Sequence, residues 1–124
     1  MPETLKSPCR DKDIKITPTK GRVTVSFDGQ VIANSTRALD LDEPGAPLRI
    51  YIPREDVEAS VLTGSETHTM CPYKGVASYH TLKSGAVEAK DAAWFYPEPC
   101  PLVEPIRDYL AFWGDQISYS VTAS

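Results

Sequence analysis

Hydrophobic and polar residues alternate along several short stretches of this chain, and that alternation predicts β-strands. The clearest case runs from Arg22 to Phe27, where valine or phenylalanine takes every second position. Asp28-Gly29 follows, a dipeptide typical of type I′ hairpin turns, so residues 30–35 are predicted to return as the paired strand. A period of two also means that one face of this hairpin is buried.

Further strands are predicted where short apolar or aromatic runs lie between glycine and proline residues. The chain has 11 prolines, and those near residues 44–53 and 97–105 would interrupt a long helix. Residues 54–62 are the one stretch where we predict a helix, of one or two turns. Pro53 suits its start, acidic residues lie in its first turn, and Thr63-Gly64 closes it. The remaining predicted strands are residues 48–52, 76–82, 87–90 and 93–96, with a closing hairpin of residues 109–113 and 117–121.

These elements predict a mainly β protein with a small antiparallel fold, either an open barrel or two packed sheets, and one short helix near residues 54–62. The length of 124 residues fits one domain. Residues 1–20 show no periodic pattern and are predicted to form a flexible N-terminal tail. The single β-rich domain is then expected over residues 21–122.

Composition narrows the function classes. The net charge is −4 and the basic residues are scattered, which argues against nucleic acid or an anionic membrane as a partner. No apolar run approaches the roughly 18 residues that suggest a membrane span. Cysteines 9, 71 and 100 form no CxxC pair, and an odd count fits a reducing compartment better than a secreted disulfide scaffold. We therefore expect a cytoplasmic protein.

One segment stands out, His68-Thr69-Met70-Cys71-Pro72-Tyr73-Lys74-Gly75. Pro72 biases Cys71 toward extended geometry, and Gly75 permits a positive φ just before a strand. A lysine held between an aromatic residue and a glycine could present its ammonium to an anion or a carbonyl group. The alternative is a purely structural turn with a buried cysteine and a solvated Lys74.

This segment, followed by Ala77-Ser78-Tyr79, resembles the hallmark of the bacterial domain-of-unknown-function 427 family. Other blocks also resemble that family, in order, over about residues 21–122. The resemblance implies a small β-rich domain with a short helix. The family has been labelled nucleotidyltransferase-like, but the resemblance implies no established activity. These blocks are Val31–Ser35, Tyr51–Val57, Asp91–Trp94, Tyr96–Pro99 and Tyr109–Trp113.

Three kinds of chemistry find little support in the residues. The chain contains no GxxxxGK(S/T) or GxGxxG phosphate cradle, so we expect no nucleotide cofactor. His68 and Cys71 make half of a zinc-like pattern that His80 and Cys100 complete unconvincingly, so we expect no metal site. His68 beside Cys71 also suggests a catalytic thiol, yet Pro72 removes the next backbone N–H that would stabilise a thiolate.

The best-supported expectation is a small anionic or carbonyl-bearing ligand, bound in a pocket at the edge of the Cys71–Gly75 turn. Aromatic walls with a few polar groups are the usual composition of such a site. One alternative is an enzyme with Lys74, Cys71 or His68 as its reactive group. Another is a protein-interaction module or homo-oligomer. The expected ligand-binding residues are Tyr73, Lys74, Tyr79, Arg37, Arg54, Trp94 and Glu98.

Overall fold

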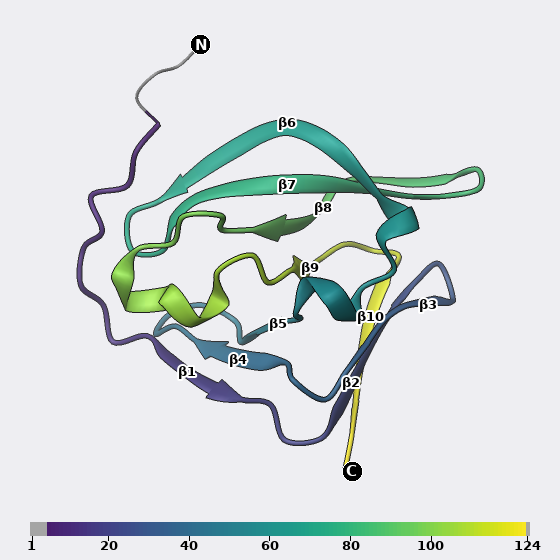
Figure 1. The fold of residues 1–124 in the computed structure, drawn as a ribbon, viewed down its shortest axis with the longest axis horizontal. Coiled ribbons are helices and arrows are strands. Elements are labelled where there is room, and N and C mark those ends of the chain that lie inside the picture. Colours follow the sequence, from purple (N-terminus) through teal and green to yellow (C-terminus); the bar gives the residue numbers. More distant parts are fainter. Residues whose placement is uncertain (1–4, 124) are drawn as a thin grey trace.

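The computed structural model describes residues 5–123 and confirms the mainly β class. The strands form three antiparallel sheets, in the orders β1-β4-β5, β10-β2-β3 and β6-β7-β8-β9 (Figure 1). The strands are β1 (Lys15–Pro18), β2 (Arg22–Phe27), β3 (Gln30–Ser35), β4 (Leu39–Asp42), β5 (Arg49–Tyr51), β6 (Leu62–Cys71), β7 (Gly75–Ser84), β8 (Val87–Phe95), β9 (Ala111–Phe112) and β10 (Ile117–Thr122).

The β2–β3 hairpin forms as its alternating pattern predicts. Val23, Val25 and Phe27 are fully buried, and the polar residues between them are not. Asp28 and Gly29 both have positive φ, as the central residues of a type I′ turn require.

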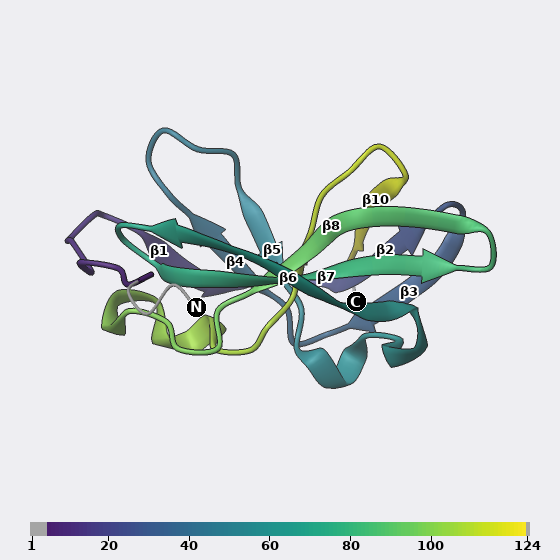
Figure 2. The ribbon, with the colours of Figure 1, turned by 90° about the horizontal axis from the view of Figure 1, so that it is seen from above.

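The β6–β7 hairpin is the longest feature of the fold and reaches from the β1–β4–β5 sheet to the β10–β2–β3 sheet (Figure 2). Because β7 and β8 run along both smaller sheets, the buried residues fall into two clusters. One cluster includes Val25, Phe27 and Leu82, and the other includes Leu41, Tyr51 and Tyr96. The second cluster underlies the site described below.

The turn of this hairpin depends on Gly75, which has a φ of 126°. A Cβ atom at this position would lie 3.3 Å from the carbonyl oxygen of Glu98, so the close approach of the two segments also requires glycine. The carbonyl oxygen of Lys74 accepts a hydrogen bond from the backbone N–H of Cys100 at 2.9 Å. The loop after β8 therefore holds the turn in place.

The predicted helix near residues 54–62 is present as two short 3₁₀ turns, η1 (Arg54–Asp56) and η2 (Ala59–Val61). A third 3₁₀ segment, η3 (Pro101–Ile106), lies in the proline-rich region. No helix among residues 5–123 is long and apolar enough to cross a membrane.

The predicted closing hairpin is wrong. Residues 111–112 pair with β8, and residues 117–122 pair with β2, so the two segments belong to different sheets. The turn between them carries the chain from one sheet to the other, because each neighbouring sheet offers a longer strand to pair with.

The segment predicted as a tail contributes to the described structure. Residues 15–18 form β1, which pairs with β4. Residues 7–12 lie across the β6–β7 turn, where the backbone N–H of Arg10 donates to the carbonyl oxygen of Pro72 at 2.7 Å. Residues 1–4 of the predicted tail lie outside the described residues.

Candidate functional site

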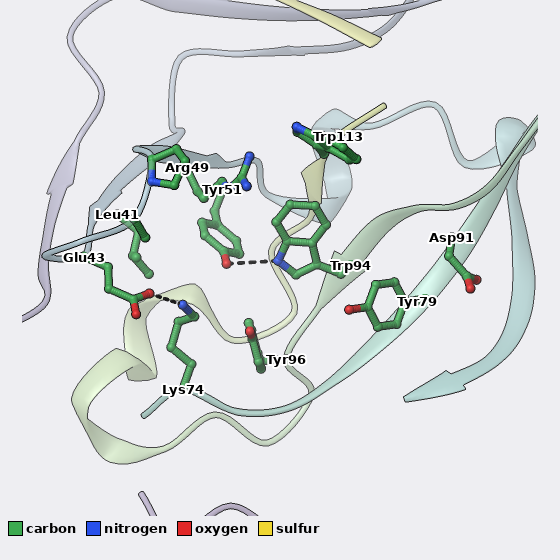
Figure 3. Close-up of a pocket in the computed structure, with 12 residues that line it drawn as sticks. Leu41, Glu43, Arg49, Tyr51, Lys74, Tyr79, Asp91, Trp94, Tyr96 and Trp113 are labelled. Carbon is green, nitrogen blue, oxygen red and sulfur yellow. Dashed lines mark hydrogen bonds and ion pairs between the residues drawn. The ribbon is translucent and has the colours of Figure 1, made fainter. Parts of the chain in front are cut away.

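A cavity of about 390 Å³ opens where β4, β5, the β6–β7 turn, β8 and β9 meet (Figure 3). Its size and aromatic walls are those of a small-molecule site. The side chains that define it are Leu41, Glu43, Arg49, Tyr51, Lys74, Tyr79, Asp91, Trp94, Tyr96 and Trp113, together with Ala46 and Pro47.

Lys74 reaches this cavity from the β6–β7 turn but is already paired with the carboxylate of Glu43. The other oxygen of Glu43 accepts a hydrogen bond from Lys12 Nζ at 2.8 Å. Burial disfavours the charged form of Glu43, but the hydrogen bonds from Lys12 and Lys74 outweigh it and hold the pKa of Glu43 below its usual value. The three side chains together carry one net positive charge.

Tyr51 and Trp94 form an ordered wall of the cavity. The indole Nε1–H of Trp94 donates to the hydroxyl oxygen of Tyr51 at 3.1 Å, and the two rings meet edge to face. Burial raises the pKa of Tyr51 to about 12, and it also raises that of Tyr96. Both hydroxyls are therefore neutral at pH 7, so neither repels an anion.

Arg49 is the functional candidate that the sequence analysis missed. Its Cζ lies 5.5 Å from the centroid of the Trp94 ring, a cation–π arrangement that leaves the guanidinium N–H edges available. Among residues 5–123, no carboxylate forms an ion pair with Arg49. The sequence feature that could have identified Arg49 is its position in the strand. Arg49 and Tyr51 are two residues apart, so their side chains share a face of β5.

Asp91 differs from Arg49 because its charge has partners. Its carboxylate accepts hydrogen bonds from Ser65 Oγ at 2.5 Å and from Thr67 Oγ1 at 2.6 Å. These bonds hold the pKa of Asp91 below its usual value. The carboxylate is thus held by β6, at the far end of the site from Glu43 and Lys74 (Figure 3).

Of the ligand-binding residues predicted from the sequence, Lys74, Tyr79 and Trp94 line this cavity. Tyr73 and Arg37 do not line it. The Tyr73 ring lies beneath Lys12 Nζ, at 4.7 Å from its centroid, and Arg37 forms an ion pair with Asp56 at 3.0 Å. Each of these two side chains interacts with an oppositely charged group or a cation from a distant part of the chain, and these partners cannot be identified from the linear sequence.

Arg54 and Glu98 also lie elsewhere. The guanidinium of Arg54 is 3.0 Å from Nε2 of His80 and stacks over the ring of Phe95. Glu98 lines a different cavity beside the N-terminal segment. Neither residue lines the cavity that contains Lys74.

His68 and Cys71 do not form a dyad. Both belong to β6 and are three residues apart, so their side chains point to opposite faces of the strand. His68 Nδ1 instead lies 3.2 Å from Ser78 Oγ on the neighbouring strand. Residues 5–123 contain no group of three histidine, cysteine or acidic side chains arranged to hold a metal ion.

Cys9 and Cys100 form a disulfide, which the odd number of cysteines did not predict. The N-terminal segment passes over the β6–β7 turn, where Ser7 Oγ donates to the carbonyl oxygen of Cys71 at 2.7 Å, and this brings Cys9 to the loop after β8. Cys71 is the free cysteine and is half-buried. The cysteine count therefore no longer supports a reducing compartment.

Comparison with known proteins gives a family and no activity. No curated protein matches the chain. A family model labelled NTP_transf_9 and described as a domain of unknown function (DUF427) matches residues 15–122. That match starts at β1 and ends at the last residue of β10, so it includes every strand of the fold. The chain belongs to the DUF427 family, as the resemblance of its sequence blocks implies.

Proposed function

We propose that this protein binds a small organic anion in the cavity between β5, the β6–β7 turn and β8. The observation that carries the proposal is the guanidinium of Arg49, which lies against an aromatic wall with no carboxylate partner among the described residues. Arginine has a planar set of N–H donors that matches carboxylates and phosphates. A partly enclosed, unpaired guanidinium is therefore a natural anchor for such a group.

The charges around the cavity support an anion rather than a cation. Glu43 and Asp91 are the acidic residues of its lining, and hydrogen bonds already engage both carboxylates. Lys12 and Lys74 outnumber the single carboxylate of Glu43 that they share. With Arg49, these two lysines give three cations against the two carboxylates of Glu43 and Asp91, so the formal charge around the cavity is +1 although the whole protein is acidic.

The reactive-group alternative has less support. The side-chain nitrogen of Lys74 is held by the carboxylate of Glu43, so it is not free to attack a bound ligand. Nucleotidyl transfer generally needs acidic side chains free to hold a metal with the phosphates, and the carboxylates of this cavity are occupied. Binding, without a chemical step, is the function that these residues fit best.

Replacement of Arg49 with methionine tests the proposal. We expect Arg49→Met to weaken the binding of small carboxylate or phosphate compounds by about 10- to 100-fold, because a charge-assisted hydrogen bond is worth about 1.5–3 kcal/mol. A panel of such compounds can be titrated while backbone amide signals of β5 and β8 are followed by NMR. Arg49 is half-exposed, so the melting temperature is expected to change little.

Arg22→Met is the matched control, since Arg22 is an exposed arginine on β2 whose guanidinium contacts Asn34 and lies outside the cavity. It is expected to leave binding unchanged. Equal binding by wild-type protein and the Arg49 variant, or signals that move only at distant residues, would count against the proposal.

A further inference from the structure

We infer that the ligand of this cavity is a planar aromatic carboxylate, whose carboxylate lies on Arg49 and whose ring lies between Trp94 and Trp113. The inference rests on the proposed function and narrows it from any small organic anion to one chemical class.

The two tryptophans project from the same face of the sheet. In the β8–β9 pair Trp94 lies opposite Ala111, and Trp113 follows two residues later, so the two indoles are diagonal neighbours. The backbone N–H of Trp113 donates to the carbonyl oxygen of Ala92 at 2.9 Å, which continues that register by one residue. Figure 3 shows both indoles at the same end of the cavity.

Trp113 is 66% exposed, which is unusual for so large an apolar side chain. An exposed tryptophan at the rim of a cavity is typical of a recognition surface, because its ring offers a rigid apolar face to a partner. A planar ring placed between the two indoles would cover the exposed face of Trp113. The aromatic part of the proposed ligand therefore follows from these two side chains.

The carboxylate follows from the number of available donors. Arg49 is a single planar group, and its fork matches one carboxylate with two parallel hydrogen bonds. Lys74 is the other cation of the lining, and its ammonium already donates to the carboxylate of Glu43. A phosphate with two negative charges and three terminal oxygens would meet too few free donors here, whereas a carboxylate with one charge is fully matched.

A second cavity of about 330 Å³ meets the first one at Arg49 and Trp113. Its other walls are mainly apolar, with Leu48, Ile50, Phe112 and Ile117 among them. Apolar substituents on the ring of the ligand would have room there. Arg49 at the junction accordingly anchors the charged group of an otherwise apolar molecule.

The chain has two tryptophans, and both lie in this site, so the two indole N–H signals in a ¹H–¹⁵N NMR spectrum report directly on it. We expect 2-naphthoate to shift both signals in a saturable way. The neutral isostere 2-naphthamide and the ring-free anion acetate are each expected to bind at least 10-fold more weakly. 2-Naphthyl phosphate is expected to bind more weakly than 2-naphthoate.

Two variants test separately how the guanidinium of Arg49 and the ring of Trp113 contribute to the binding of 2-naphthoate. Arg49→Lys keeps the charge but loses the planar fork, and we expect it to reduce the affinity for 2-naphthoate about 10-fold. Trp113→Leu should have a similar effect on 2-naphthoate and none on acetate, with the Trp94 signal as the reporter. Arg22→Met again serves as the control and should bind 2-naphthoate as the wild type does.

The inference is overturned if 2-naphthamide or 2-naphthyl phosphate binds as tightly as 2-naphthoate, or if none of the three binds. Should acetate or inorganic phosphate bind in an Arg49-dependent manner without any preference for 2-naphthoate, the proposed function stands and this inference alone fails. If no anion shifts either indole signal or the amides of β5, both fail together.

Discussion

Reduction of the Cys9–Cys100 disulfide is expected to lower the free energy of unfolding by about 4 kcal/mol, the largest single effect that we predict. The two cysteines are 91 residues apart, and a cross-link that closes so long a loop strongly restricts the unfolded chain. In the folded protein, residues 5–13 bury no side chain fully, so little besides the disulfide and a few polar contacts holds this segment. Urea denaturation with and without a phosphine reductant measures the difference.

The double variant Cys9→Ser/Cys100→Ser should match the reduced wild-type protein and should not respond to the reductant. Cys71→Ser is the control, because Cys71 is free and half-buried; its stability should stay near that of the wild type and remain sensitive to reductant. If the unfolding midpoint of the wild-type protein is the same in both buffers, the disulfide does not contribute as proposed.

Glu43→Gln is expected to destabilise the protein by about 2 kcal/mol at pH 7. The side chain of Glu43 is 11% exposed and its carboxylate accepts hydrogen bonds from two lysines, so its neutralisation leaves Lys12 and the largely buried Lys74 without their counter-charge. Fully buried pairs lose about 3–5 kcal/mol when one partner is removed, and exposed pairs about 0–1 kcal/mol. Glu43 lies between these limits, and chemical denaturation at pH 7 measures its contribution.

The pH dependence of this effect provides a second test. The pKa of Glu43 is depressed below its ordinary value of 4.5, so its stabilisation is fully present above that value and is lost as the pH falls through the folded-state pKa. The difference between the wild type and Glu43→Gln should therefore disappear in acid. Glu104→Gln is the matched control, since Glu104 pairs with Arg107 on the surface, and a loss of stability equal to that of Glu43→Gln would contradict our account.

Strands with one buried face could be predicted from the sequence, and strands without one could not. The β2–β3 hairpin follows its alternating pattern because every second residue enters the core. β6 was missed because none of its residues is buried, so no period appears in its largely polar sequence. β8 was divided into two strands because Asp91, with a φ of 54°, forms an irregularity that the pairing with β7 absorbs.

The mainly β class, the family and the unusual turn that carries Lys74 could all be predicted from the residues alone. These depend on local preferences of proline, glycine and alternating apolar residues, which act over a few positions. Which side chains share a cavity depends on the three-dimensional fold, because β5, the β6–β7 turn and β9 lie far apart along the chain and meet through sheet pairing. The fold places Arg49 in one cavity with Trp94 and Trp113. It also pairs Lys74 with Glu43, whereas Tyr73 and Arg37 contact other residues.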